Sequence, residues 1–103
     1  MICAHTVRRL KPGTFDQFAR DFGPPGDQPP AGWVRFHMLR SVSNPDEVVT
    51  FGFFDGTVEE LERSQEEHGY KDRRASVDDL VDEVLLNGLY EVVVTRATEG
   101  ASA

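Results

Sequence analysis

The chain has 103 residues, a net charge of −7, and 28% charged against 39% hydrophobic residues. This length predicts one domain, and this composition is typical of a soluble globular protein rather than a disordered or membrane-spanning one. The acidic balance argues against nucleic-acid binding, which needs a basic surface to neutralise phosphates. A single cysteine, Cys3, excludes an internal disulfide. With no signal-peptide pattern at the N-terminus, we expect a cytoplasmic protein.

Seven elements are predicted along the chain, in the order strand, helix, strand, strand, helix, helix, strand. The first strand ends at Lys11-Pro12-Gly13, which favours a turn. Thr14 is then a predicted helix N-cap, because Gln17 three residues later completes a capping-box pattern. A loop rich in proline and glycine follows at residues 23–32. The seven elements are expected at residues 2–8, 15–22, 33–42, 48–54, 58–68, 77–85 and 89–96.

The two central strands are expected to form a hairpin around the turn at residues 43–46. Side chains alternate between the two faces of a strand. The alternation places Val34, Phe36 and Met38 on one face, and Trp33, Arg35, His37 and Leu39 on the other. The strand at 48–54 is apolar at nearly every position, which predicts that both of its faces are covered.

The second half of the chain predicts two helices and a closing strand. Thr57 and Glu60 form a second capping-box pattern, and the helix that they begin is expected to break at Gly69. Ser76 is expected to cap the next helix, because the apolar residues of 77–85 are spaced three and four apart. A valine-rich strand follows at 89–96, and residues 98–103 are expected to be a frayed tail.

This order predicts an α+β domain of ferredoxin-like β-α-β-β-α-β topology over residues 1–97. Its helices would lie on one face of a four-stranded antiparallel sheet. The helices suffice for only one face of the sheet, and large apolar groups occupy both. A homodimer is the simplest way to bury the second face.

Several segments of the chain resemble a known family. They are the Lys11-Pro12-Gly13 turn, the strand at 33–40, the Pro45-Asp46-Glu47 turn, Phe53-Phe54-Asp55 and the closing strand at 89–94. Together they are similar to the antibiotic biosynthesis monooxygenase-like group of the dimeric α+β barrel superfamily. The resemblance implies a homodimeric barrel with a ligand pocket in each subunit between the sheet and the helices.

His68 is the first candidate for catalysis. Many members of the family carry a histidine late in the second helix, and His68 matches that position. An imidazole there can act as a general base near neutral pH, or it can simply cap the end of the helix. His37 is the second candidate, because it is expected to share a strand face with Arg35 and Trp33. That face could hold an anionic or phenolic ligand, or it could meet a dimer partner.

The remaining ligand candidates are Phe54 and Tyr70, which could line a space under the helices beside Gly52 or could be core residues. The spacing of the three histidines supports no metal site. No cofactor is expected. Haem is disfavoured, because the haem-degrading branch of the family has a tryptophan on its second helix, whereas the one tryptophan here is Trp33 on a strand.

Two functions are open at this point. The resemblance implies a cofactor-independent oxygenase that acts on a small aromatic or phenolic molecule. The alternative is a non-catalytic dimeric module that binds a small ligand or serves in stress. The sequence contains no evident acid–base pair, which favours the alternative.

Overall fold

The computed structural model describes residues 1–22 and 30–97. Its elements are β1 (Ile2–Leu10), α1 (Phe15–Phe22), β2 (Trp33–Arg40), β3 (Glu47–Phe54), α2 (Val58–Glu67), α3 (Tyr70–Val77), the 3₁₀ turn η1 (Asp78–Leu80) and β4 (Val81–Glu91). Most of the loop expected at 23–32 and all of the tail at 98–103 lie outside the described residues. Within the part described, no helix is long and apolar enough to cross a bilayer.

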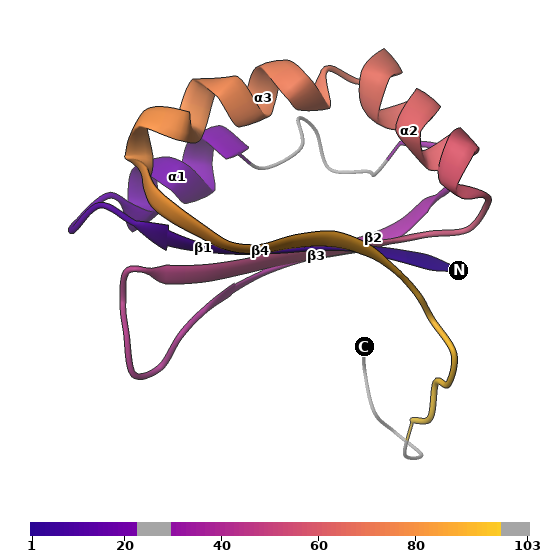
Figure 1. The fold of residues 1–103 in the computed structure, drawn as a ribbon, viewed down its shortest axis with the longest axis horizontal. Helices are drawn as coiled ribbons and strands as arrows, with labels where there is room; N and C mark the ends of the chain where they lie inside the picture. The colour runs from indigo at the N-terminus through magenta and orange to yellow at the C-terminus, as the bar shows by residue number, and fades with distance from the viewer. Residues whose placement is uncertain (23–29, 98–103) are drawn as a thin grey trace.

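The four strands form one antiparallel sheet in the order β2-β3-β1-β4. The three described α-helices all lie over the same face of this sheet, and no described helix covers the opposite face (Figure 1). We call these the helix-covered face and the open face. The order of the strands and the one-sided placement of the helices confirm the predicted ferredoxin-like α+β fold.

The core lies between the helix-covered face and the helices α1 and α3. Buried and intermediate positions alternate strictly along β3. The residues that close the core are all apolar and almost fully buried: Leu10, Phe18, Phe22, Val48 and Val77. This periodicity explains why the sequence forms the layer, because every second residue of β1 and β3 meets a helix.

The helix α2 begins and ends at the residues that the local sequence predicted, within one residue. Thr57 accepts a hydrogen bond from the Glu60 amide, and the Glu60 carboxylate accepts one from the Thr57 amide, so the capping box is formed. Gly69 ends this helix with a φ of 68°, a left-handed conformation that suits glycine. At α1 the Thr14 hydroxyl instead donates to the Lys11 carbonyl at 2.8 Å.

The helix expected at 77–85 is wrong. The third helix is α3, which begins at Tyr70 and ends at Val77, and β4 already begins at Val81. The last strand therefore begins eight residues earlier than predicted, at Val81 rather than at residue 89, and ends at Glu91 rather than near residue 96. The physical reason is long-range pairing: residues 81–91 bond along most of β1, the central strand. The apolar residues at 81–85 fit the spacing of a helix as well as they fit a strand. Pairing with β1 selected the strand over the helix that the spacing predicted.

The face predicted for Trp33 is also wrong. The pairing of β2 with β3 shifts between Trp33 and Arg35, which face the consecutive residues Phe54 and Phe53. One residue, Val34, is thereby left without a partner, and such a bulge reverses the alternation. Trp33 accordingly lies on the helix-covered face, and Arg35 on the open face.

Candidate functional site

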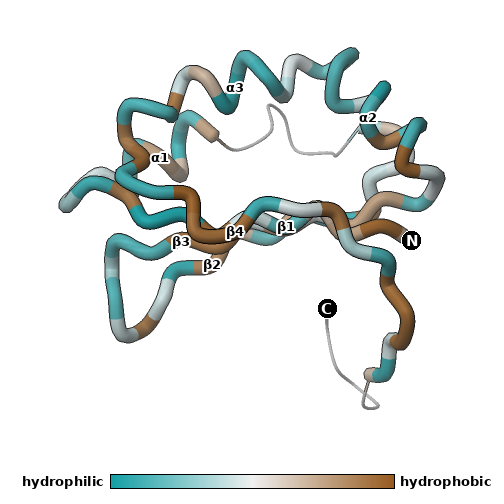
Figure 2. The backbone as a smooth tube through the Cα atoms, viewed as in Figure 1, coloured by the Kyte–Doolittle hydropathy of each residue, from teal (hydrophilic) through white to brown (hydrophobic). Residues whose placement is uncertain are grey.

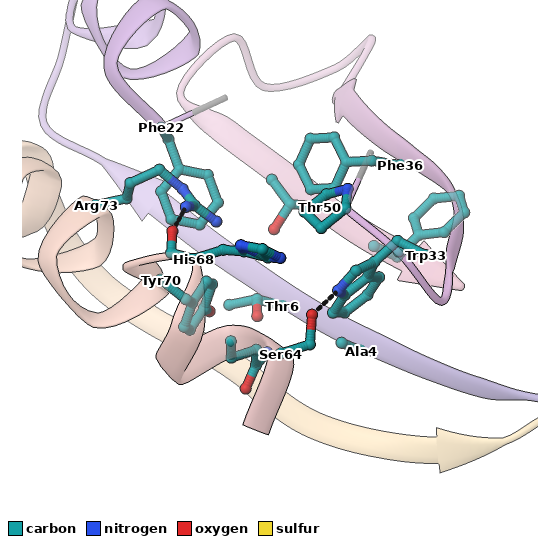
Figure 3. Close-up of a pocket in the computed structure, with 14 residues that line it drawn as sticks. Ala4, Thr6, Phe22, Trp33, Phe36, Thr50, Ser64, His68, Tyr70 and Arg73 are labelled. Carbon is teal, nitrogen blue, oxygen red and sulfur yellow. Dashed lines mark hydrogen bonds between the residues drawn. The ribbon is translucent and has the colours of Figure 1, made fainter. Parts of the chain in front are cut away.

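A cavity of about 90 Å³ lies between the helix-covered face and the junction of α2 with α3 (Figure 3). Apolar and aromatic side chains dominate its wall. The lining residues are Ala4, Thr6, Phe22, Pro30, Trp33, Phe36, Thr50, Phe51, Gly52, Ser64, Gln65, His68, Tyr70 and Arg73. An apolar cavity of about 150 Å³ can hold a benzene ring. At about 90 Å³ this cavity is smaller, so a ligand of one ring would fill it and extend out through its mouth.

Trp33 forms one wall of the cavity, and three neighbours fix its indole. The indole Nε1 donates to the Ser64 hydroxyl on α2 at 3.0 Å. The ring of Phe54 meets it edge to face, with the centroids 5.2 Å apart. Gly52 leaves the room that the indole occupies, because a Cβ there would lie 2.9 Å from the Trp33 Cζ3 atom. Gly52 therefore serves a packing contact between two strands.

His68 stands at the mouth of the cavity. It is the residue that ends α2, and Figure 3 shows its imidazole directed into the space between Tyr70 and Trp33. The residue as a whole is exposed, so water reaches the ring from the outer side. Its backbone carbonyl accepts a hydrogen bond from Arg73 at 2.5 Å, which ties the C-terminus of α2 to α3.

A buried cation lies behind part of the cavity wall, against the lining residues Phe22 and Thr50. Arg8 of β1 lies under α1, with its guanidinium carbon 4.6 Å from the centroid of the Phe22 ring. One of its nitrogens donates to the Thr50 hydroxyl at 3.2 Å. The pKa of Arg8 is lowered by burial, an effect that the nearby Tyr70 partly offsets. Sequence reasoning missed Arg8. The signal was its place between Thr6 and Leu10 on the buried side of a strand.

The open face carries a different set of groups. The ring of Phe51 stacks between His37, at a centroid distance of 4.9 Å, and His5, at 5.7 Å. The guanidinium of Arg35 lies over the ring of Phe53. His37 and Arg35 are therefore separated by the sheet from the cavity that His68 and Trp33 line, and the grouping predicted from sequence is not formed.

The predicted site residues thus divide between two places. His68, Trp33 and Tyr70 come together in the cavity, and Phe54 lies behind the indole of Trp33. Among the described residues, no cluster of three or more side chains could hold a metal ion. Burial raises the pKa of the Cys3 thiol, which keeps it protonated and less nucleophilic at neutral pH.

No sequence-family model matches this chain, and no curated protein matches it. Solved structures do match. A candidate antibiotic biosynthesis monooxygenase from Chloroflexus aurantiacus has a TM-score of 0.76 at 16% identity over 93% of this chain and 96% of its own. One from Nitrosomonas europaea has a TM-score of 0.69 at 20% identity over 91% of this chain and all of its own.

A third match is a variant of SnoaB, a cofactor-independent oxygenase from Streptomyces nogalater. It has a TM-score of 0.61 at 17% identity, and the match covers 97% of each chain. At these identities the likeness concerns the fold. The chain has the fold of the antibiotic biosynthesis monooxygenase-like proteins, as the resemblance in its sequence implied.

Proposed function

We propose that this protein is a cofactor-independent oxygenase of a small aromatic or phenolic molecule that binds in the cavity between the sheet and the helices. The observation that carries the proposal is the placement of the imidazole of His68 inside an aromatic-lined cavity. Trp33, Phe22 and Phe36 offer apolar surfaces to an aromatic ring, and His68 offers a group that exchanges protons near neutral pH.

The proposed reaction needs no metal or organic cofactor, because the substrate supplies the electrons. His68 would remove the proton of a phenol, and the resulting anion reduces O₂. A carbon–oxygen bond then forms on the ring, and the peroxide that results loses water to leave a quinone. The overall change is one phenol and one O₂ converted to one quinone and one water, so no external reductant enters.

Oxygen consumption tests this proposal directly. The probes are 1-naphthol and a panel of single-ring phenols and quinols, followed with an oxygen electrode and, under ¹⁸O₂, by mass spectrometry of the quinone. We expect one labelled oxygen in the product and a loss of roughly 100-fold in rate for His68→Gln, the usual scale of general-base catalysis. Glu66→Gln, an exposed change two residues earlier on α2, is the matched control. An unchanged rate in His68→Gln would remove the proposed base.

The proposal includes a homodimer that buries the open face of the sheet. Leu39, Leu86 and Tyr90 are exposed large side chains on its strands. The segment after β4 descends on the same side of the sheet (Figure 1) and is strongly hydrophobic (Figure 2). Val93 and Val94 of this segment are largely exposed. Contiguous apolar surface of this kind marks association sites, and a second copy of the sheet would match it.

A non-catalytic ligand-binding module is the second candidate. It is favoured by one observation: within the described residues, the imidazole of His68 makes no hydrogen bond to a carboxylate that would orient it as a base. The oxygenase would convert a bound phenol with consumption of oxygen, whereas the binding module would only bind it. A panel in which phenols bind but no oxygen is consumed would favour the binding module.

A further inference from the structure

The cavity differs in charge from the rest of the molecule. The chain has 18 acidic and 11 basic residues, yet among residues 1–22 and 30–97 none of those that line the cavity is acidic. The shallow hollow on the other side of His68, by contrast, has three acidic lining residues, Asp55, Glu60 and Glu67, beside one arginine, Arg63. An excess of carboxylates on the surface and their absence from the cavity indicate that the cavity is not built for a cation.

Arg8 supplies a buried positive charge beside the cavity wall. The residue is 3% exposed and its guanidinium lies against the rings of Phe18 and Phe22. The Thr50 hydroxyl accepts one of its hydrogen bonds, and Asp78 acts on it through space without a hydrogen bond. Burying a charged group costs free energy on the order of several kcal/mol unless a partner of opposite charge or a hydrogen bond compensates it. Among the described residues, no carboxylate accepts a hydrogen bond from the guanidinium of Arg8.

Arg73 brings a second guanidinium to the part of the cavity that Phe22 and Tyr70 line. It lines the cavity from α3, and its Nε is buried without a hydrogen-bond partner among the described residues. Its guanidinium carbon lies 5.9 Å from the centre of the Tyr70 ring. The ring of Tyr70 also meets that of Phe22 edge to face, and Arg8 lies against the ring of Phe22. Tyr70 and Phe22 thus lie near two cations, and one of these, Arg73, has an unused donor.

We infer that the ligand of this cavity is a small aromatic carboxylate whose acid group lies beside Tyr70 and Arg73, with the buried charge of Arg8 behind the wall that Phe22 and Thr50 form. The inference rests on the proposed function in taking the cavity as the ligand site, and it narrows the ligand class. A guanidinium matches the planar, two-oxygen geometry of a carboxylate and binds it with charge-assisted hydrogen bonds. The carboxylate would supply the acceptor that Arg73 lacks, and its ring would lie against Trp33.

Three probes of the same size test the charge of the ligand: benzoate, benzyl alcohol and benzylamine, titrated at neutral pH with detection by NMR of ¹⁵N-labelled protein. We expect benzoate to bind about tenfold more tightly than benzyl alcohol, and benzylamine to bind least. In Arg73→Gln the advantage of benzoate over benzyl alcohol should fall to about twofold. Arg74→Gln, on the exposed neighbour along α3, is the matched control and should keep the full advantage.

Arg8→Met gives a second test, since it removes the buried cation while retaining an apolar stem of similar length. It too should lose preference for benzoate, and Arg73→Gln decides the matter if Arg8→Met does not fold. Equal binding of benzoate and benzyl alcohol to the unmodified protein would overturn the carboxylate inference and leave an aromatic site intact. Failure of all three probes to bind would overturn the aromatic ligand site itself, and the inference with it.

Discussion

The two faces of the sheet are nearly equal in apolar content and opposite in environment. On β3 the residues Val48 and Phe54 point to the helices and are almost completely buried. Their neighbours Val49, Phe51 and Phe53 point to the open face and keep an intermediate exposure. Figure 1 shows the cause, because every helix lies over one face and none over the other. Hydrophobicity alone therefore does not say which residues hold this chain together.

The comparison also separates two kinds of chemistry. The helix-covered face holds a cavity with an imidazole at its mouth, the guanidinium of Arg73 in its lining and that of Arg8 behind its wall. The open face holds the stack of His5, Phe51 and His37, whose rings pack on one another across three strands. Such flat aromatic surface suits burial against another protein surface better than it suits a small ligand.

The largest effect is expected from a deletion on the covered side. Phe18→Ala removes a fully buried ring, so it should lower the free energy of unfolding by about 3–5 kcal/mol. Urea denaturation followed by circular dichroism measures it. Phe51→Ala is the matched deletion on the open face and should cost clearly less at a protein concentration where the chain is monomeric. Equal losses would contradict the distinction between the faces.

The next largest effect is expected on self-association. Phe51→Glu places a charge at the centre of the open face, and a central aromatic residue of an interface is worth about 2 kcal/mol or more. The dissociation constant of the homodimer should therefore rise at least about 30-fold. Sedimentation velocity reports this as a shift from twice the chain mass to once. Val42→Glu, at a fully exposed position outside the strands, should leave the mass unchanged. A monomeric starting protein would sink the dimer proposal.

A smaller effect is expected where the cavity wall meets β3. Gly52→Ala would place a methyl group against the indole of Trp33, and such overpacking costs about 1–3 kcal/mol. Since Trp33 is the one tryptophan of the chain, its fluorescence should shift as the bond to Ser64 is disturbed. Gly88→Ala is the matched control, because its new Cβ would meet only the movable end of the Tyr90 side chain. A change in fluorescence in Gly88→Ala but not in Gly52→Ala would refute this account of the wall.

The smallest effect is expected at the start of α2. Thr57→Ala breaks the capping box and should cost about 1 kcal/mol. The hydrogen bond from the Thr57 amide is the largest cause of the lowered pKa of Glu60. The interaction with the Thr57 side chain is the second cause and also lowers this pKa. The stabilisation by Glu60 is therefore present above the ordinary glutamate pKa and is lost as the pH falls through the lowered one.

Thermal unfolding of Glu60→Gln across acidic and neutral pH checks this sign. The melting temperature of Glu60→Gln should lie below that of the unmodified protein at neutral pH and converge with it in acid. Glu59→Gln changes the preceding residue, which is outside the capping box. Its melting temperature should show no such pH-dependent difference from that of the unmodified protein. Divergence toward acid pH would mean that the carboxylate of Glu60 does not stabilise the helix.

The cavity could be predicted from the sequence only in part. His68 was found because its position matches a family pattern, and Tyr70 as an aromatic residue that could line a space beside Gly52. Arg8 and Arg73 were missed: the alternation of β1 was the only sign for Arg8, and nothing local marks Arg73 as a residue that lines a cavity. Trp33 was found as a residue and placed on the wrong face, because a bulge of one residue reverses the alternation on which the prediction depended.

The sequence by itself determined the elements whose signals are local: the capping box of Thr57 and Glu60, the break at Gly69, and the apolar run of β3 that gives large side chains to both faces of the sheet. Only the tertiary structure decided the fate of residues 81–91 and the face of Trp33. In both cases two local conformations fit the pattern about equally well. Pairing with a distant strand then selected one, through backbone hydrogen bonds and burial that no window of neighbouring residues contains.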